Sequence, residues 1–123
     1  MTFTPVWTPE ASDVYYDLRD KAEAALKARR LSKKKKSSKQ EGLFKQVKKC
    51  IDLLLENPRH PGLHTHEFRS LQHPYDINEK VFEAYAQHGT PSAYRVFWGY
   101  GPEKGHLTII AITPHPWCFY ALP

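Results

Sequence analysis

The fold is decided by the stretch AYRVFWGYGPEKGHLTIIAIT, residues 93–113. Two runs rich in aromatic and β-branched residues, 93–100 and 106–113, flank a glycine-containing pentapeptide at 101–105. This order predicts two antiparallel strands joined by a hairpin loop. Residues 80–87 (KVFEAYAQ) alternate and predict the preceding strand, so 81–113 forms an antiparallel meander, and 64–71 (HTHEFRSL) predicts one more strand.

Two helices are predicted ahead of these strands. Thr8 is a good N-cap and Pro9 suits the first helical position, so the first helix should run to about residue 30. Apolar side chains recur at helical spacing across residues 43–55, and the Asn-Pro dipeptide at 57–58 should end the second helix. Residues 31–40 are almost free of apolar side chains, which predicts an exposed connection within an antiparallel helical hairpin.

The order of the elements indicates an α+β fold. A short edge strand is predicted at residues 2–7, because the segment alternates and contains a proline that an edge tolerates. We expect the helical hairpin to cover one face of a small antiparallel sheet. The opposite face should carry polar side chains and form a concave binding surface.

Length and composition narrow the class of protein. At 123 residues, with 41% apolar and 13% aromatic residues, the chain suits one domain spanning 1–123. It contains no apolar run long enough to span a membrane and no signal-peptide pattern at its start, so we expect a cytoplasmic protein without a membrane partner. Cys50 and Cys118 are the two cysteines, and no spacing suggests a metal or a cofactor.

Positive charge is concentrated between Lys27 and Lys49. This segment holds eleven Lys or Arg residues against one acid, so it carries +10 while the remainder of the chain carries −5. A polyanion such as RNA is the simplest partner, because clustered lysines release condensed counterions when they contact phosphates. The alternative is a solubilising loop. The candidate RNA-binding residues are Arg30, Lys33, Lys34, Lys35, Lys36 and Lys39.

Several stretches resemble the RelE/ParE superfamily of bacterial toxins. They are VWTPEA at 6–11, NPRHPGL at 57–63, YRVFW at 94–98 and HLTIIAITPH at 106–115. The resemblance implies two helices on a small antiparallel sheet and a cognate antitoxin that neutralises the toxin. It also implies one of two activities: ribosome-dependent cleavage of mRNA in RelE-like members, or inhibition of gyrase in ParE-like members.

Cleavage of RNA without a metal needs a base, an acid and cations that stabilise the transition state. Histidine can serve as base or acid near neutral pH, and arginine can bind phosphate through its planar guanidinium. The catalytic candidates are His64, His66, Arg69, Arg95, His115 and Tyr120. We expect His60, His73 and His88 to be surface histidines without a role. The alternation of a strand predicts His64 and His66 on one side and Glu67 with Arg69 on the other.

Other readings of the same residues stay open. Trp117 and Phe119 could stack on an RNA base, or could close the end of the core together with Tyr120. His64 and His66 could bind a metal, but a third ligand at convincing spacing is missing. The leading prediction is a RelE-like, metal-independent endoribonuclease that cleaves mRNA on the ribosome. A ParE-like gyrase inhibitor and an inactive RNA-binding relative are the alternatives.

Overall fold

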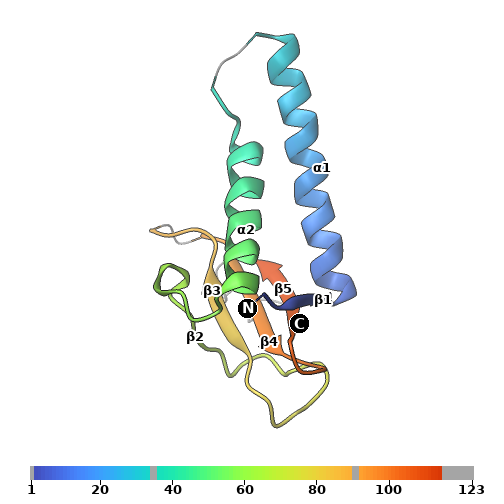
Figure 1. Cartoon of the computed structure of the whole chain (residues 1–123). Helices are drawn as coiled ribbons and strands as arrows, with labels where there is room; N and C mark the ends of the chain where they lie inside the picture. The colour runs from blue at the N-terminus through green and yellow to red at the C-terminus, as the bar shows by residue number, and fades with distance from the viewer. Residues whose placement is uncertain (1, 34–35, 90–91, 115–123) are drawn as a thin grey trace.

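The computed structural model describes residues 2–33, 36–89 and 92–114. Its elements, in order, are β1 (Thr4–Trp7), α1 (Pro9–Leu31), α2 (Lys39–Glu56), the 3-10 helix η1 (Pro61–Leu63), β2 (His66–Glu67), β3 (Phe82–Tyr85), β4 (Arg95–Tyr100) and β5 (His106–Thr113). The two helices form an antiparallel hairpin whose tip projects beyond the sheet (Figure 1). The predicted α+β class is confirmed.

The predicted start of the first helix is also confirmed. The Thr8 hydroxyl accepts a hydrogen bond from the Ala11 N–H at 3.1 Å and donates one to the Ile110 carbonyl at 2.7 Å. One side chain therefore caps α1 and ties it to β5. The connection between the helices is residues 32–38, slightly shorter than the predicted 31–40.

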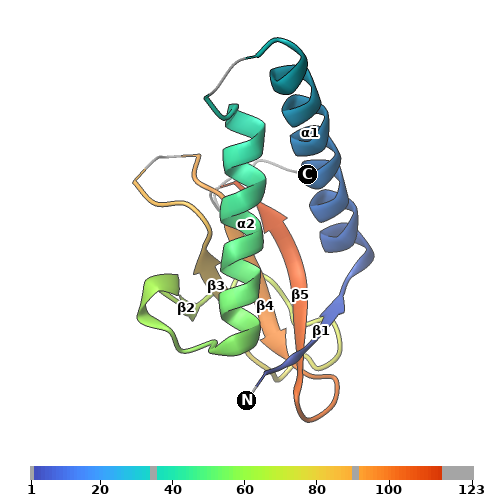
Figure 2. The ribbon, with the colours of Figure 1, turned by 45° about the horizontal axis from the view of Figure 1, so that its top comes forward.

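The sheet is mixed: the predicted antiparallel meander is confirmed in β3, β4 and β5, whereas the edge strand β1 runs parallel to β5. Its strand order is β1-β5-β4-β3-β2, with β1 parallel to β5 and the other pairs antiparallel. Figure 2 shows β1 alongside β5 at one edge, as expected for an edge strand. β1 and β5 are neighbours in the sheet, although the helical hairpin and the other three strands separate them in sequence.

The strand predicted at 64–71 is reduced to two residues. His64 has a left-handed φ of 49° after η1, and only His66 and Glu67 pair with β3. Phe68 and Leu71 instead pack against a second cluster of buried residues, made of Val81, Phe97 and Ile110. Alternation along 64–71 did not reveal that its apolar members cover the sheet rather than extend it.

That second cluster corrects the expectation of a polar face opposite the helices. We call this face the far face. In β4 and β5, Phe97 lies opposite Ala111 and Trp98 opposite Ile109, so Ile110 is the extra residue of a β-bulge. The bulge directs both Ile110 and Ala111 to the far face, where they add apolar surface that residues 68–71 cover.

The main core lies between the helices and the sheet. It joins buried residues of α2, such as Val47 and Leu54, to Trp98 of β4 and Ile109 of β5. Burial of this apolar surface is the main driving force for the packing of the hairpin on the sheet. Over the described ranges, neither helix is both long and apolar enough to cross a bilayer.

Candidate functional site

Several polar side chains surround the ring of Tyr85 at the end of β3. The ring centroids of His64, His66 and His88 lie 5.6, 5.8 and 5.6 Å from that of Tyr85. The guanidinium carbon of Arg95 lies 3.7 Å from the same centroid, at cation–π distance. Together with Glu83, which pairs with His66, these residues form what we call the Tyr85 cluster: His64, His66, Glu83, Tyr85, His88 and Arg95.

Strand alternation places the middle of this cluster. Phe82 and Ala84 belong to the core beneath the helices, so Glu83 and Tyr85 point to the far face. Cross-strand pairing then sets Arg95 opposite Tyr85. The cluster thus occupies the end of the far face that Phe68 and Leu71 leave uncovered.

The histidines reach Tyr85 from three different places. His66 comes from β2, where it lies opposite Glu83. His64 follows η1 in a left-handed conformation, and His88 follows β3 in the turn before residue 90. The prediction that His64 and His66 share one side of a strand was wrong in its geometry, since His64 is not in the strand, although both rings reach Tyr85.

A short ion pair joins His66 to Glu83. Nε2 of His66 lies 2.6 Å from Oε1 of Glu83, whose side chain is 3% exposed, and Oε2 of Glu83 is buried without a hydrogen-bond partner among the described residues. Nδ1 of His66 lies 3.3 Å from the His64 carbonyl, which can only accept a hydrogen bond. Both ring nitrogens of His66 are therefore engaged, and the residue links His64 to Glu83.

Arg95 is buried rather than exposed to a ligand. It is 6% exposed, and its Nη1 donates to the carbonyls of Gln87, Ala93 and Tyr94 at 3.1, 3.2 and 3.4 Å. These acceptors and the Tyr85 ring offset much of the cost of burying a cation. Arg95 fixes the ring of Tyr85 and the ends of the turn between β3 and β4, and adds a positive charge beneath the ring.

His64 and His88 are the accessible members of the cluster. Both are exposed, and their ring centroids lie 4.9 Å apart in an edge-to-face arrangement. Among the described residues, the ring nitrogens of His64 and His88 make no hydrogen bond. Lying side by side, the two imidazoles can face one bound phosphodiester together, one as base and one as acid.

The remaining predicted catalytic residues lie outside the cluster. Arg69 is on the other side of β2, where its Nε is 3.5 Å from Oε2 of Glu67 and its side chain is 87% exposed. His115 and Tyr120 lie outside the described residues. Their segment follows Thr113, the cross-strand neighbour of Arg95, so the chain leaves β5 beside the cluster.

The sequence prediction missed Tyr85, Glu83 and His88 as site residues. A signal for the first two was present, because in VFEAYA a carboxylate and a phenol fall two residues apart on one side of an otherwise apolar strand. His88, like His60 and His73, was expected to be a surface histidine without a role. Its place beside His64 depends on the path of η1, which no local pattern specifies.

For His73 the surface expectation was wrong. His73 is 3% exposed; its Nδ1 accepts hydrogen bonds from the N–H groups of Tyr75 and Asp76, and its Nε2 donates to the Tyr100 carbonyl at 2.8 Å. It holds the segment after β2 against β4. His60 accepts a hydrogen bond from the Gly62 N–H at 2.9 Å and so caps η1.

The basic segment begins at the tip of the helical hairpin and continues along α2 toward the sheet (Figure 1). Of the predicted RNA-binding residues, Arg30, Lys33, Lys36 and Lys39 are exposed there, and Lys34 and Lys35 lie outside the described residues. α1 has 23 residues and is therefore about 35 Å long at 1.5 Å per residue. The tip is joined to the cluster by α2, whose Lys49 lines a pocket with Tyr85 and His88.

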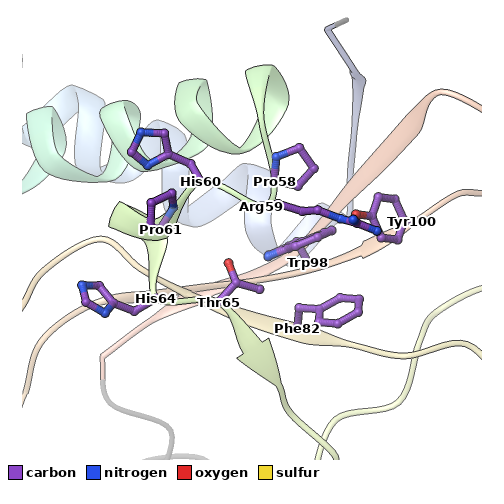
Figure 3. Close-up of a pocket in the computed structure, with 9 residues that line it drawn as sticks. All are labelled: Pro58, Arg59, His60, Pro61, His64, Thr65, Phe82, Trp98 and Tyr100. Carbon is purple, nitrogen blue, oxygen red and sulfur yellow. The ribbon is translucent and has the colours of Figure 1, made fainter.

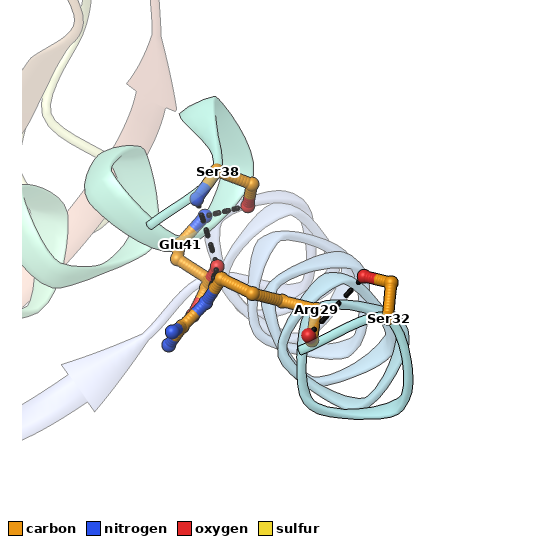
Figure 4. A network of polar contacts seen from close by, with 4 residues as sticks. All are labelled: Arg29, Ser32, Ser38 and Glu41. Carbon is orange, nitrogen blue, oxygen red and sulfur yellow. Dashed lines mark hydrogen bonds and ion pairs between the residues drawn. The ribbon is translucent and has the colours of Figure 1, made fainter. Parts of the chain in front are cut away.

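An arginine clamp fixes the base of this tip. Nη2 of Arg29 lies 2.9 Å from Oε1 of Glu41, and Glu41 also closes a capping box with Ser38 at the start of α2 (Figure 4). The hydrogen bonds from Arg29 and from the Ser38 backbone lower the pKa of Glu41 from 4.5 to about 2. The clamp joins the end of α1 to the start of α2 and so anchors the two helix ends that border the connection.

Metal ligands do not gather at either surface. Across the described ranges, no three His, Cys, Asp or Glu side chains are grouped so that they could hold a metal ion. The Tyr85 cluster has one carboxylate, and it is engaged with His66. What this arrangement supplies is imidazole groups for proton transfer beside a buried cation.

Comparison with known proteins supports the fold. No known protein family and no curated protein matches the chain by sequence. Among solved structures, it is similar to a chain of the archaeal RelE–RelB complex from Pyrococcus horikoshii OT3, with a TM-score of 0.54 and 13% sequence identity over 94% of this chain and 98% of that one. An identity this low bears on the fold and not on the activity. The chain therefore has the fold of RelE, as the resemblance of its sequence implied.

Proposed function

We propose that this protein is the toxin of a toxin–antitoxin pair and that it cleaves RNA at the Tyr85 cluster without a metal ion. The observation that carries the proposal is the gathering of His64, His66 and His88 around Tyr85, above the buried Arg95. These side chains come from three stretches of the chain, residues 64–66, residues 85–88 and Arg95. Packing alone does not require three imidazoles at one end of a sheet, whereas acid–base catalysis does need such groups close together.

The cluster supports a proton-transfer mechanism. One imidazole of the exposed His64–His88 pair removes the proton of the 2′-hydroxyl, whose oxygen then attacks the adjacent phosphorus. The bond from phosphorus to the 5′-oxygen breaks, and the leaving oxygen takes a proton from the other imidazole. The guanidinium of Arg95 provides positive charge near the developing phosphorane, and His66, held by Glu83, stands beside Tyr85 as a further hydrogen-bonding group.

Three further predicted residues keep supporting roles in this proposal. His115 lies outside the described residues, two positions after Thr113, and we retain it as a candidate because Thr113 is the neighbour of Arg95 in the sheet. Tyr120 is close in sequence, and Arg69 is an exposed cation in the turn after β2 that can bind a flanking phosphate.

We assign the hairpin tip to the binding of RNA, either mRNA or the ribosome. Its exposed lysines carry no chemistry but attract phosphates over the distance of a Debye length. α2 leads from the tip to the cluster: the side chain of its Gln46 is hydrogen-bonded to that of Gln87, and its Lys49 lines a pocket together with Tyr85 and His88. One RNA could therefore contact both the basic segment and the cluster.

We also propose a cognate antitoxin as the second partner. The structural neighbour was solved as a complex of RelE with RelB, and this chain shares its fold over 94% of its length. The exposed histidines and the basic tip would both be open to an acidic antitoxin segment.

The test is expression and purification of the protein with single substitutions. In a bacterial host without an antitoxin, the wild type should arrest growth and yield cleaved mRNA. His64→Gln and His88→Gln should each lower the cleavage rate by about 10²–10⁴-fold, the range for loss of a general acid or base. His106→Gln is the matched control, since His106 lies at the opposite end of β5 from the cluster.

Two outcomes would contradict the proposal. Normal growth and intact transcripts at good protein levels would contradict a toxin function and favour an inactive RNA-binding relative. Growth arrest that survives both histidine substitutions, with no cleaved RNA, would favour a non-enzymatic inhibitor of the ParE type.

A further inference from the structure

A pocket of about 440 Å³ lies on the side of the sheet that faces α2, where the chain turns from α2 into β2. Phe82, Trp98 and Tyr100 line it from the sheet, and Arg59 and Thr65 line it from the turn (Figure 3). Its volume falls within the range of small-molecule sites. The pocket and the Tyr85 cluster share one residue, His64, which lines the pocket and whose ring lies beside that of Tyr85. The other residues of the cluster do not line the pocket.

The walls of the pocket are aromatic and rigid. The rings of Phe82 and Trp98 are stacked at 4.8 Å, with 28° between their planes. Tyr100 stands edge-on to Trp98 at 5.1 Å and is partly exposed at the mouth. Fixed aromatic faces of this kind bind planar rings, because stacking costs little conformational entropy in the protein.

Two buried polar groups at the base of the pocket lack partners. Within the described part of the chain, neither Nε1 of Trp98 nor Oγ1 of Thr65 makes a hydrogen bond, although both atoms are buried. In the close-up the indole nitrogen and the hydroxyl point toward one another (Figure 3). A buried polar group without a partner destabilises the protein, and a ligand that supplies one recovers that free energy.

The charge at the pocket favours an anion. Arg59 is exposed at the rim and, among the described residues, makes no ion pair. None of the lining side chains is acidic. A planar ring with hydrogen-bonding atoms on its edge and a phosphate beside it satisfies the aromatic walls, the two unpartnered groups and the guanidinium together.

We infer that this pocket binds one nucleotide of the RNA, with its base against the aromatic walls and its phosphate on Arg59. The inference rests on the proposed function for its RNA substrate and adds the part of the site that selects a base. Since His64 belongs to both surfaces, the bound nucleotide lies next to the phosphate that is cleaved. The pocket would thus determine which nucleotide stands beside the cleavage point.

The first experiment measures binding of the four nucleoside 5′-monophosphates to the full-length protein by calorimetry. We expect saturable binding at one site, with one base preferred. Arg59→Gln and Tyr100→Leu should each raise the dissociation constant about three- to tenfold, the effect of losing one hydrogen bond or one stacking contact. Arg19→Gln is the matched control, because Arg19 is an exposed arginine on α1.

Thr65→Val separates a binding role from a structural one. If the hydroxyl is kept for a ligand, its replacement by a methyl group of similar shape should raise the thermal midpoint of the ligand-free protein and weaken nucleotide binding about threefold or more. A hydroxyl that serves the fold would lower the midpoint when removed. Opposite signs for stability and binding therefore support the inference, and a lowered midpoint with unchanged binding overturns it.

Other results would also overturn it. Absence of saturable binding for all four nucleotides would do so, as would binding that Arg59→Gln and Tyr100→Leu leave unchanged. Displacement of bound nucleotide by a short aromatic peptide that binds more tightly would make the pocket a protein-docking site instead.

Failure of the proposed function and failure of the pocket inference give different experimental outcomes. Nucleotide binding at the pocket without RNA cleavage would contradict the proposed function and leave the inference standing. Cleavage with the same base preference in wild type, Arg59→Gln and Thr65→Val would overturn the inference and leave the function standing.

Discussion

Alanine at Gly99 should lower the free energy of unfolding by about 2–3 kcal/mol. A Cβ at this position would lie 2.7 Å from Cδ2 and 2.9 Å from Nε2 of His73, closer than packed atoms approach. The ring cannot easily move aside, because three hydrogen bonds hold it: one to the Tyr100 carbonyl at 2.8 Å and two from the N–H groups of Tyr75 and Asp76 at 3.2 and 3.3 Å.

The size of this effect follows from the contacts that must give way. Each of the three hydrogen bonds contributes about 1 kcal/mol net, and overpacking a buried site typically costs about 1–3 kcal/mol. Urea unfolding followed by circular dichroism measures the change. Gly42→Ala is the matched control, because Gly42 lies in α2 with no heavy atom within 4 Å of its added Cβ. It should gain about 0.5–1 kcal/mol from helix propensity.

A double-mutant cycle identifies the clash as the cause. In a His73→Ala background the ring is absent, so Gly99→Ala should cost far less than in the wild type. The reasoning would be refuted if Gly99→Ala were as stable as wild type, or if its cost were the same with and without the His73 ring.

Three further predictions concern charge and burial. The pKa of Glu41 is lowered from 4.5 to about 2 by Arg29, so the contribution of this carboxylate to stability is complete above about pH 4.5 and is lost as the pH falls toward 2. Glu41→Gln should abolish that part of the acid sensitivity in unfolding titrations, and an unchanged pH profile of stability would contradict the prediction. Replacing Lys33 to Lys36 by glutamine should reduce the slope of log affinity against log salt for single-stranded RNA by up to about 3, without removing cleavage. An unchanged slope with lost cleavage would contradict the assignment of the tip to RNA binding. Burial raises the pKa of the Cys50 thiol to about 12, so a Cys118→Ser variant should react slowly with a thiol reagent at pH 8 until it is unfolded, and rapid reaction of the native protein would contradict this.

The parts of the fold that local chemistry specifies were predictable from the sequence. Thr8 and Pro9 mark the start of α1, and the hairpin loop at 101–105 carries positive φ angles of 102° and 84° at its first and last glycines. These features depend on residues within a few positions of one another. The parallel pairing of β1 with β5 is different, because it joins residues about a hundred positions apart and no local pattern encodes it.

The candidate site was predictable only in part, for a related reason. His64, His66 and Arg95 stand out by residue type, and the structure brings all three to Tyr85. The other members of the cluster depend on the irregular path from η1 to β2 and on the shortness of β2. The sequence pattern of 64–71 shows neither feature, because it suggests one continuous strand. Side-chain chemistry therefore located the region, while the tertiary fold selected its members, including His88.

The distribution of unpaired buried polar atoms links these two sites. Among the described residues, the side-chain atoms that are buried without a hydrogen-bond partner belong to Glu83 and Arg95 in the Tyr85 cluster, to Thr65 and Trp98 in the aromatic pocket, and to His106 elsewhere on β5. Each such atom costs about 1–3 kcal/mol relative to a paired or apolar one. Sequences tolerate costs of this kind mainly where function needs the group, and four of these five residues gather where the proposed RNA substrate would supply a partner or a compensating charge. A purely structural sheet edge would have replaced them with apolar side chains of similar shape.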